Sequence, residues 1–438
     1  MTLGFDNARH LLSRAGFGGT PDMISRFAKL SRRDAVRQLI NNTNIAARTP
    51  HPMWVDDPPP KPEMRKTMRR ELRKIRKERS ESLKSWWYQE LFTSSSPLAE
   101  RMTLFWHNHF TSSLRKVKNP TLLFHQNVLL RKHALGNFRD LLHAVAKNPA
   151  MVIFLDGQTN RKNKPNENFA RELLELFTLG EGNYTEADVK EAARAFTGWK
   201  VKRRTGDFRF VKRAHDSGDK TFLRKTGAFD GDDIIDIILD QPRTAELIVE
   251  KLWRAFVSPE INHREVTKLA KILRKNYDLK ATLSALFQSD AFFSSKNRGA
   301  LIKSPVELLV GTVRLFGLSR TKDHKRVVQA GRQLGQDLFN PPNVKGWGGG
   351  NAWITSHTLI IRQGILRQIA SELRGKIKGP DPQKYIKKWL GDVSSNDRDA
   401  AKQLRRVLLP VEAIQFASGT LQFSDIESIL LDPTFQLK

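Results

Sequence analysis

Apolar residues recur along most of this 438-residue chain at intervals of three and four positions, with polar residues between them. This spacing places the apolar side chains on one face of an α-helix, so each such stretch predicts an amphipathic helix. The expected helices are residues 97–109, 120–134, 137–147, 232–239, 243–257, 263–275, 280–288, 305–316, 323–338, 357–373 and 398–408. The pattern therefore predicts a mostly α-helical fold with a large multi-helix domain, orthogonal or bundle-like.

The first 62 residues combine two short helices with a connector. Residues 7–40 read as two helices that break at residues 16–21, where Thr20 can cap the second helix and Pro21 can be its first residue. Residues 50–62 are rich in proline, which lacks an N–H group and excludes a regular helix. We expect an extended connector there.

A long helix is expected over residues 63–92, and its two halves differ in character. Residues 65–79 contain nine Lys or Arg residues, whereas the later part carries Trp86 and Trp87. This contrast predicts an arm whose basic half lies in solvent and whose aromatic half packs on the core. A nucleic-acid-binding face is the alternative interpretation.

The pattern changes after Trp199, where apolar and basic residues alternate on both sides of a glycine-containing turn. Alternation with a period of two is typical of strands, so we expect a small β-hairpin insertion near residues 199–223. The expected segments are residues 1–60 (N-terminal helices and connector), 61–95 (basic helix arm), 96–375 (main helical domain with the hairpin) and 376–438 (C-terminal helices).

Composition indicates a folded protein with a strongly positive surface. Apolar residues make up 39% of the chain, which is enough for a sizeable core, while 75 Lys and Arg against 46 Asp and Glu leave a net charge of +29. Such a field attracts nucleic acid, acidic polysaccharide or an anionic membrane face. A basic surface without a function is the alternative.

Several classes of site lack support. The chain has no cysteine, which excludes disulfides, thiolate zinc sites and Cys-ligated iron–sulfur clusters. We find no P-loop, dinucleotide fingerprint, haem signature, His-Glu-x-x-His motif or nucleophile-elbow serine. Because no export signal or membrane-length apolar run is visible, we expect a soluble protein, cytoplasmic by default and without a transmembrane segment.

The first candidate constellation lies in a helical hairpin from Pro165 to Trp199. At 100° per residue, one arc of its first helix gathers the polar side chains Glu167, Asn168, Arg171, Glu172, Glu175 and Thr178. An ordinary amphipathic helix has such a face. Three glutamates on one face of a basic protein also suit a cation site or acid–base chemistry, with Glu167 and Glu172 as catalytic candidates and Asn168 and Arg171 as ligand-binding candidates.

The second constellation is the pair His107 and His109, set among aromatic residues at the end of an expected helix. Side chains two positions apart diverge by ~200° on a helix, so the two rings could share a divalent metal only if the helix ends between them. Buried structural histidines are the alternative.

The third constellation is the loop of residues 215–221. His215 and Asp216 could act as an acid–base pair, and Lys220 could bind a phosphate or sulfate oxygen. Loops of this composition are also common turns.

The fourth constellation is the glycine-rich loop of residues 340–353, which carries Trp347 and Trp353. Exposed Trp rings offer a stacking face for sugars or bases, whereas buried ones would pin the loop.

Four stretches together resemble the bacterial family catalogued as domain of unknown function eighteen hundred. They are residues 11–18, 106–110, 166–199 and 340–347, within a likeness that spans residues 8–370. The resemblance implies a mostly helical fold, frequent association with envelope or exported proteins, and gene neighbours that resemble sulfatases, but no activity. The chain departs from the family pattern at Gly348, where proline is expected, and at Arg224, where glycine is expected.

Three functions are compatible with the sequence. The first is an enzyme, or the partner of one, acting on an acidic or sulfated polysaccharide. The second is a non-catalytic scaffold of the cell envelope that holds a polyanion or a sulfatase-like protein. The third is nucleic-acid binding, which is weakened because residues 61–79 contain no aromatic residue to stack on bases.

Overall fold

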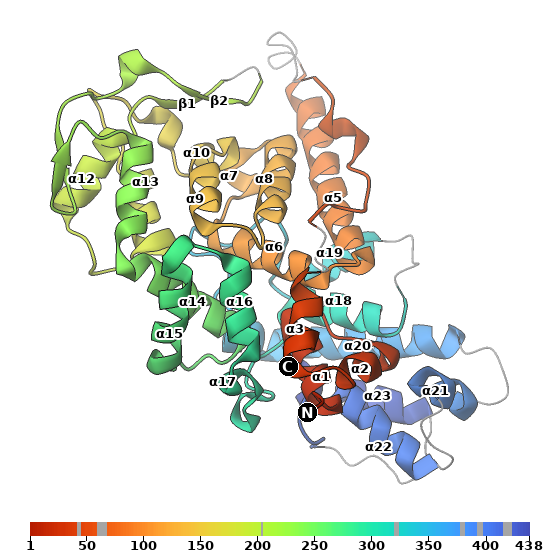
Figure 1. The fold of residues 1–438 in the computed structure, drawn as a ribbon. Helices are drawn as coiled ribbons and strands as arrows, with labels where there is room; N and C mark the ends of the chain where they lie inside the picture. Colours follow the sequence, from red (N-terminus) through yellow and green to blue (C-terminus); the bar gives the residue numbers. More distant parts are fainter. Residues whose placement is uncertain are drawn as a thin grey trace.

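The computed structural model describes residues 1–41, 45–58, 68–202, 205–318, 324–376, 382–391, 397–414 and 423–438. These parts of the chain are mostly helical (Figure 1), which confirms the predicted fold class. The longer helices are α1 (Phe5–Ala15), α2 (Pro21–Ala28), α3 (Arg32–Asn41), α5 (Arg69–Thr93), α6 (Pro97–His109), α8 (Pro120–Lys132), α9 (Phe138–Ala146), α12 (Glu186–Ala195), α13 (Gly231–Asp240), α14 (Pro242–Phe256), α15 (His263–Asn276), α16 (Leu279–Gln288), α18 (Pro305–Leu315), α19 (His324–Gln333), α20 (Ser356–Lys376), α21 (Pro382–Leu390), α22 (Asp397–Leu408) and α23 (Phe423–Leu431).

Short helical segments connect many of these helices. They are η1 (Met53–Val55), α7 (Leu114–Val117), α10 (Pro149–Phe154), η2 (Gly157–Thr159), α11 (Asn168–Glu172), η3 (Leu173–Thr178), η4 (Lys212–Ala214), α17 (Asp290–Phe293), η5 (Ser295–Asn297), η6 (Gly350–Trp353) and η7 (Pro433–Gln436). None of the helices in the described residues is long and apolar enough to cross a membrane.

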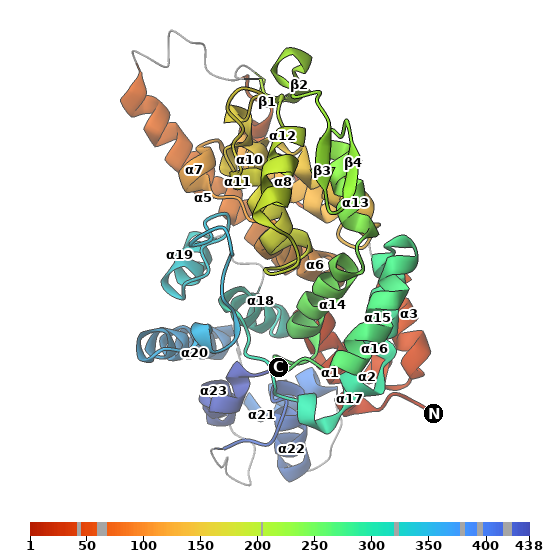
Figure 2. The same ribbon diagram turned by 90° about the vertical axis from the view of Figure 1, so that its left-hand side faces the viewer.

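The helices are arranged in two regions, which meet where α5 packs against α18 and α19 and where α6 packs against α1. Helices α5 to α13 and the β-strands form one region, and α14 to α23 form the other (Figure 1). The N-terminal helices α1 and α2 lie in the second region beside the C-terminal helices in both views (Figures 1 and 2). The two ends of the chain therefore pack together. The division into four segments stays a prediction.

Helix α6 is almost entirely buried. Leu98, Met102 and Trp106 are buried, and so is the charged residue Glu100. A helix with so little exposed surface must be covered on all sides, and its polar groups need partners. Arg131 supplies two hydrogen bonds to the Glu100 carboxylate, at 2.6 and 3.1 Å.

The local rules that predicted the N-terminal helices hold, although the structure has three helices there where we expected two. Thr20 accepts a hydrogen bond from the Met23 backbone N–H, as a cap should, and Pro21 is the first residue of α2. The long basic helix is also present as α5, with Trp87 fully buried at its aromatic end. Residues 59–67, where we expected this helix to begin, lie outside the described residues.

Two small β-hairpins follow α12. Strand β1 (Trp199–Val201) pairs with β2 (Phe208–Phe210) in antiparallel register, which confirms the predicted insertion. A second hairpin, β3 (Lys220–Phe222) with β4 (Lys225–Gly227), extends the insertion beyond residue 223. Its two turn residues, Leu223 and Arg224, have φ values of 45° and 66°. Positive φ at both positions is the pattern of a type I′ turn, which glycine and asparagine favour.

Candidate functional site

The polar face of the expected helix at residues 167–178 has a different geometry from the one we predicted. The α-helical part, α11, ends at Glu172, and residues 173–178 continue as a π-helix. The Thr178 hydroxyl donates to the Leu173 carbonyl at 2.6 Å, which stabilises the wider turn. Because a π-turn contains more than 3.6 residues, the prediction at 100° per residue is wrong beyond Glu172. Such turns occur frequently at functional sites.

Two carboxylates of this segment lie in a shared, partly buried environment. Burial raises the pKa of Glu172, the nearby Glu175 carboxylate raises it further, and Lys345 and Arg171 oppose the shift. Glu175 lies 3.7 Å from the Lys345 ammonium, measured from Oε1 to Nζ. Burial and Glu175 also raise the pKa of Tyr184. The two glutamates therefore differ: one is shifted toward its protonated form, and the other faces a cation.

Three other candidates on this helix have structural partners. Arg171 donates to both oxygens of Glu186, at 2.7 and 2.8 Å, and to Glu167 at 3.0 Å. The Asn168 amide donates to the Leu155 carbonyl at 3.1 Å. These contacts fasten α11 to α12 and to the preceding turn. Glu167, Asn168 and Arg171 therefore hold the hairpin together in this structure.

The condition under which His107 and His109 could share a metal is not met, because α6 continues through both residues. The His107 Nε2 atom accepts a hydrogen bond from the Phe339 N–H at 3.1 Å, and burial lowers the His107 pKa to about 3. In the described residues, no group of three or more His, Asp or Glu side chains is arranged to hold a metal ion. We therefore interpret both rings as buried hydrogen-bonding groups.

His109 links α6 to the π-helix and to α14. The Lys251 ammonium lies 3.0 Å from His109 Nδ1 and donates to the Leu176 carbonyl at 2.6 Å. Because an ammonium group only donates, Nδ1 accepts, and Nε2 carries the proton toward the Phe177 carbonyl at 3.1 Å. Burial lowers the pKa of His109 well below its ordinary value and that of Lys251 to about 8. Two buried donors thus fix the carbonyls at the end of the π-helix.

The glycine-rich loop is clamped onto the same end of α6. The Asn108 side chain accepts from the Trp347 N–H at 2.8 Å and donates to the Trp347 carbonyl at 3.3 Å. Gly346 has φ +80°, and a Cβ atom there would lie 2.4 Å from the Asn108 Oδ1 atom. Only glycine fits such a close approach. Trp347 and Trp353 are 6% and 8% exposed, so of the two alternatives the structure favours buried rings that pin the loop.

The loop of residues 215–221 is attached to α12. Arg194 binds Asp216 through Nε and Nη2, at 2.8 and 3.2 Å. Lys220 is buried and donates to the Asp216 and Gly218 carbonyls, at 2.6 and 2.8 Å. His215 donates through Nδ1 to the Thr197 carbonyl at 3.0 Å. These contacts attach the loop to α12 and to its own backbone, none of them is made with Glu172 or Glu175, and we interpret the loop as a structural turn.

Three segments that are far apart in the sequence therefore meet at one place, which we call the junction: the end of α6 (residues 107–111), the π-helical segment (residues 172–178) and the glycine-rich loop (residues 340–347). The contacts of Asn108, His109 and Lys345 join them, and the Thr111 hydroxyl adds a hydrogen bond to the Val344 carbonyl at 2.6 Å. Figure 2 shows the loop after α19 running up toward the region of α6 and α11. The structure brings the segment of His107 and His109 together with the segment of Glu172 and Glu175, whereas the contacts of the His215 loop are with Thr197 and α12.

Sequence reasoning missed two lysines of the junction. Lys251 lies in the run Ile248-Val249-Glu250-Lys251-Leu252. Its position next to buried residues of an amphipathic helix is the signal that could have identified it. Lys345 lay inside the glycine-rich motif, but nothing in the local sequence indicates that it faces Glu175.

One comparison with known proteins is informative. A family model described as "Protein of unknown function (DUF1800)" matches residues 10–437, which is nearly the whole chain. No curated protein and no solved structure matches it.

Proposed function

The chain belongs to the DUF1800 family of proteins of unknown function, and within that family we propose that it is an acid–base enzyme acting on an anionic polysaccharide at the junction. The observation that carries this proposal is the meeting of three distant segments around a pair of glutamates, one of which has a raised pKa. Paired carboxylates whose environments differ are the usual equipment for acid–base catalysis.

The proposed roles follow from the surroundings of each carboxyl group. Glu172 is half-buried beside a second carboxylate, so it retains its proton to higher pH than a free glutamate and acts as the acid. Glu175 faces the Lys345 ammonium and acts as the base. Glu172 donates its proton to the glycosidic oxygen as the C–O bond breaks, and Glu175 takes a proton from the water whose hydroxyl adds to the sugar carbon.

The hydrogen-bonding groups around the π-helix are well suited to hold the two glutamates in place. Lys251 and His109 fix the carbonyls of the π-helix, and Asn108 fixes the loop that carries Lys345. Catalytic groups must be held within a fraction of an ångström, and buried hydrogen bonds provide this rigidity. His107 and His109 are positioning residues in this proposal.

The proposed class of substrate follows from the net charge of the protein. A net charge of +29 creates a positive field that concentrates polyanions near the surface. A polysaccharide combines such charge with glycosidic bonds that an acid and a base can cleave.

The test is the release of reducing ends from a panel of uronic acid and sulfated polysaccharides by the full-length protein. We expect Glu172→Gln and Glu175→Gln each to lower turnover by about 10²- to 10⁴-fold, the usual contribution of a positioned acid or base. Glu181→Gln is the matched control, because Glu181 is an exposed carboxylate in the turn after the same helix and should keep full activity. Equal turnover by Glu172→Gln and the wild type would contradict the proposal.

A basic groove supports the second candidate, a non-catalytic polyanion-binding protein. A hollow of about 1080 Å³ between α5, α7, α8 and the β1–β2 hairpin is lined by Arg76, Arg79, Lys116, Lys118 and Lys202, with Asp57 and Asp207. Among the described residues, Arg76 and Lys118 show no ion pair. This candidate predicts that the wild type binds a polymer of the same panel without releasing reducing ends. It also predicts that the double variant Arg76→Gln/Lys118→Gln loses this binding. Comparing DNA with polysaccharide over a salt series would separate the nucleic-acid alternative.

A further inference from the structure

A second charged cavity lies between residues of α1 and α22. These two helices are at the end of the molecule opposite the β1–β2 hairpin (Figure 1). Its volume is about 670 Å³, within the range of pockets that bind small organic ligands. Five cationic side chains and two carboxylates line it: Arg9, Arg298, Lys402, Arg405 and Arg406, with Asp6 and Glu412. The lining therefore carries an excess of positive charge.

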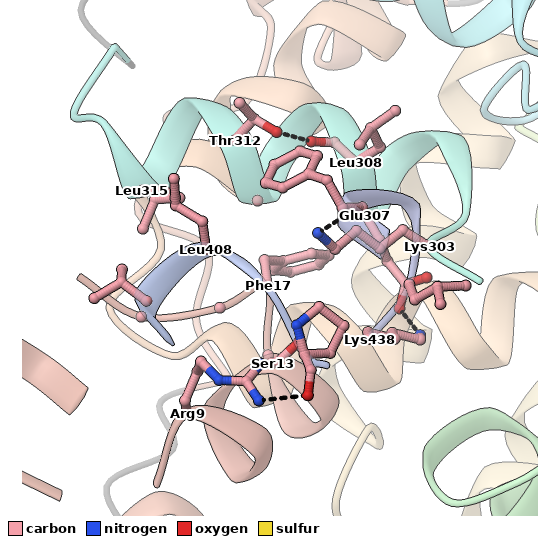
Figure 3. Close-up of a pocket in the computed structure, with 18 residues that line it drawn as sticks. Arg9, Ser13, Phe17, Lys303, Glu307, Leu308, Thr312, Leu315, Leu408 and Lys438 are labelled. Atoms are coloured by element: carbon pink, nitrogen blue, oxygen red, sulfur yellow. Dashed lines mark hydrogen bonds and ion pairs between the residues drawn. The ribbon is translucent and has the colours of Figure 1, made fainter. Parts of the chain in front are cut away.

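Arg9 is the buried cation of this cavity. Its side chain is 8% exposed, and one terminal nitrogen donates to the Pro410 carbonyl at 3.1 Å, the contact drawn in Figure 3. The Arg9 Nε atom is buried and has no hydrogen-bond partner. Among the described residues, the guanidinium makes a single hydrogen bond, so its other terminal nitrogen is available to an oxyanion in the cavity that Arg9 lines. Burial also lowers the pKa of Arg9 to about 10.

The other cations surround Arg9 with different degrees of pairing. Arg406 binds Asp6 at 3.2 Å, and Arg298 donates to the Asn7 side chain. Lys402 and Arg405 are three positions apart on α22, so they share one face of the helix. Neither has a side-chain partner among the described residues.

The remaining lining is apolar and includes Leu409, Pro410, Val411 and Ala413. A free inorganic ion would use only the cationic part of such a site, whereas a ligand with both an oxyanion and an apolar body would use all of it. Arginine suits this task because its planar group binds phosphate and sulfate oxygens in pairs.

We propose that this cavity binds a small organic phosphate or sulfate monoester, with its oxyanion held by Arg9, Lys402 and Arg405 and its apolar body against Pro410 and Val411. The proposal does not depend on the chemistry at the junction. Because the site joins α1 to α22, an occupant would also tie the N-terminal helices to the C-terminal ones. Ligand binding would then stabilise the folded chain by mass action.

The probe is 1-naphthyl phosphate, titrated into the full-length protein by calorimetry, with 1-naphthyl sulfate, inorganic phosphate and neutral 1-naphthol in parallel. We expect saturable binding of at least one monoester, at least tenfold tighter than 1-naphthol. Inorganic phosphate should bind more weakly than the better monoester. The phosphate and sulfate arms identify which oxyanion is preferred.

Arg405→Gln should weaken monoester binding at least tenfold, and Lys402→Gln, at an exposed position, provides a second variant that does not affect packing. Lys271→Gln/Lys275→Gln removes two exposed charges from α15 and is the matched control. Glu172→Gln should bind the probe normally, so failure at this cavity is distinguishable from failure at the junction. Unsaturable binding by the wild type, or an equal loss in the α15 control, would overturn the proposal.

Discussion

Among single residues, Glu307 has a distinct role, because its carboxylate neutralises the charge of several buried cations. Its carboxylate lies 2.8 Å from Arg101 and also binds Lys438, and all three side chains are less than 10% exposed. Figure 3 shows Glu307 and Lys438 beside Lys303, which donates to the Phe435 carbonyl at 2.6 Å. Burial alone would raise the pKa of Glu307, but Arg101, Lys438 and the Ser304 N–H together lower it to about 2. The group therefore stays ionised inside the protein.

Substitution of Glu307 should lower the free energy of unfolding more than most other single changes do. Glu307→Gln leaves buried cations without a counter-charge, and breaking a buried pair in this way costs about 3–5 kcal/mol of unfolding free energy. The measurement is denaturant unfolding of the variant and the wild type. Asp290→Asn is the control, because its pair with Arg32 is exposed on the Asp290 side and should contribute well under about 1 kcal/mol. If Glu307→Gln loses as little unfolding free energy as Asp290→Asn, this role of Glu307 is contradicted.

Glu307 also makes the stability of the folded protein depend on pH in the acidic range. The folded pKa of about 2 lies below the ordinary value of about 4.3, so Glu307 stabilises the folded state fully above that ordinary value. This contribution is lost as pH falls from about 4.3 toward 2. The Glu307→Gln variant should therefore lose less stability over this interval than the wild type does.

At the scale of secondary-structure elements, local chemistry was a reliable guide and long-range packing was not. The capping box of Thr185 with Asp188 begins α12 as the sequence indicates, because both partners lie within one turn. The π-helix after Glu172 was not predictable, since its carbonyls are held by His109 and Lys251 from distant helices. Spacing in the sequence carries no information about such partners.

The β3–β4 turn provides a prediction at this scale. Arg224 has φ +66°, where a side chain costs about 1–2 kcal/mol relative to glycine. Arg224→Gly should therefore increase the unfolding free energy by roughly 1 kcal/mol, measured by denaturant unfolding. Lys225→Gly, at the first residue of strand β4, should destabilise the protein, because glycine has a low strand propensity and the change removes the ion pair of Lys225 with Asp240. Destabilisation by both changes would show that the turn is not strained at Arg224.

At the scale of the whole molecule, the sequence indicated charge and fold class but not which ends of the chain meet. The hydrogen bond from Arg9 to the Pro410 carbonyl joins residues 401 positions apart, and no periodic pattern predicts it. The junction was only partly predictable. Its motifs could be singled out, whereas the separation of the His215 loop and the role of Lys345 depend on tertiary packing.

We propose that the Glu172 and Glu175 pair performs acid–base chemistry on an anionic polymer. The most direct measurement is the pH profile of polysaccharide cleavage by the wild type and by Lys345→Gln. Lys345 lowers the Glu172 pKa, so its removal should raise that pKa. Activity requires protonated Glu172 and falls as pH rises through its pKa. The alkaline limb should therefore move to higher pH in Lys345→Gln and stay in place in Lys190→Gln, an exposed control on α12. An alkaline limb that does not move in Lys345→Gln would contradict the claim.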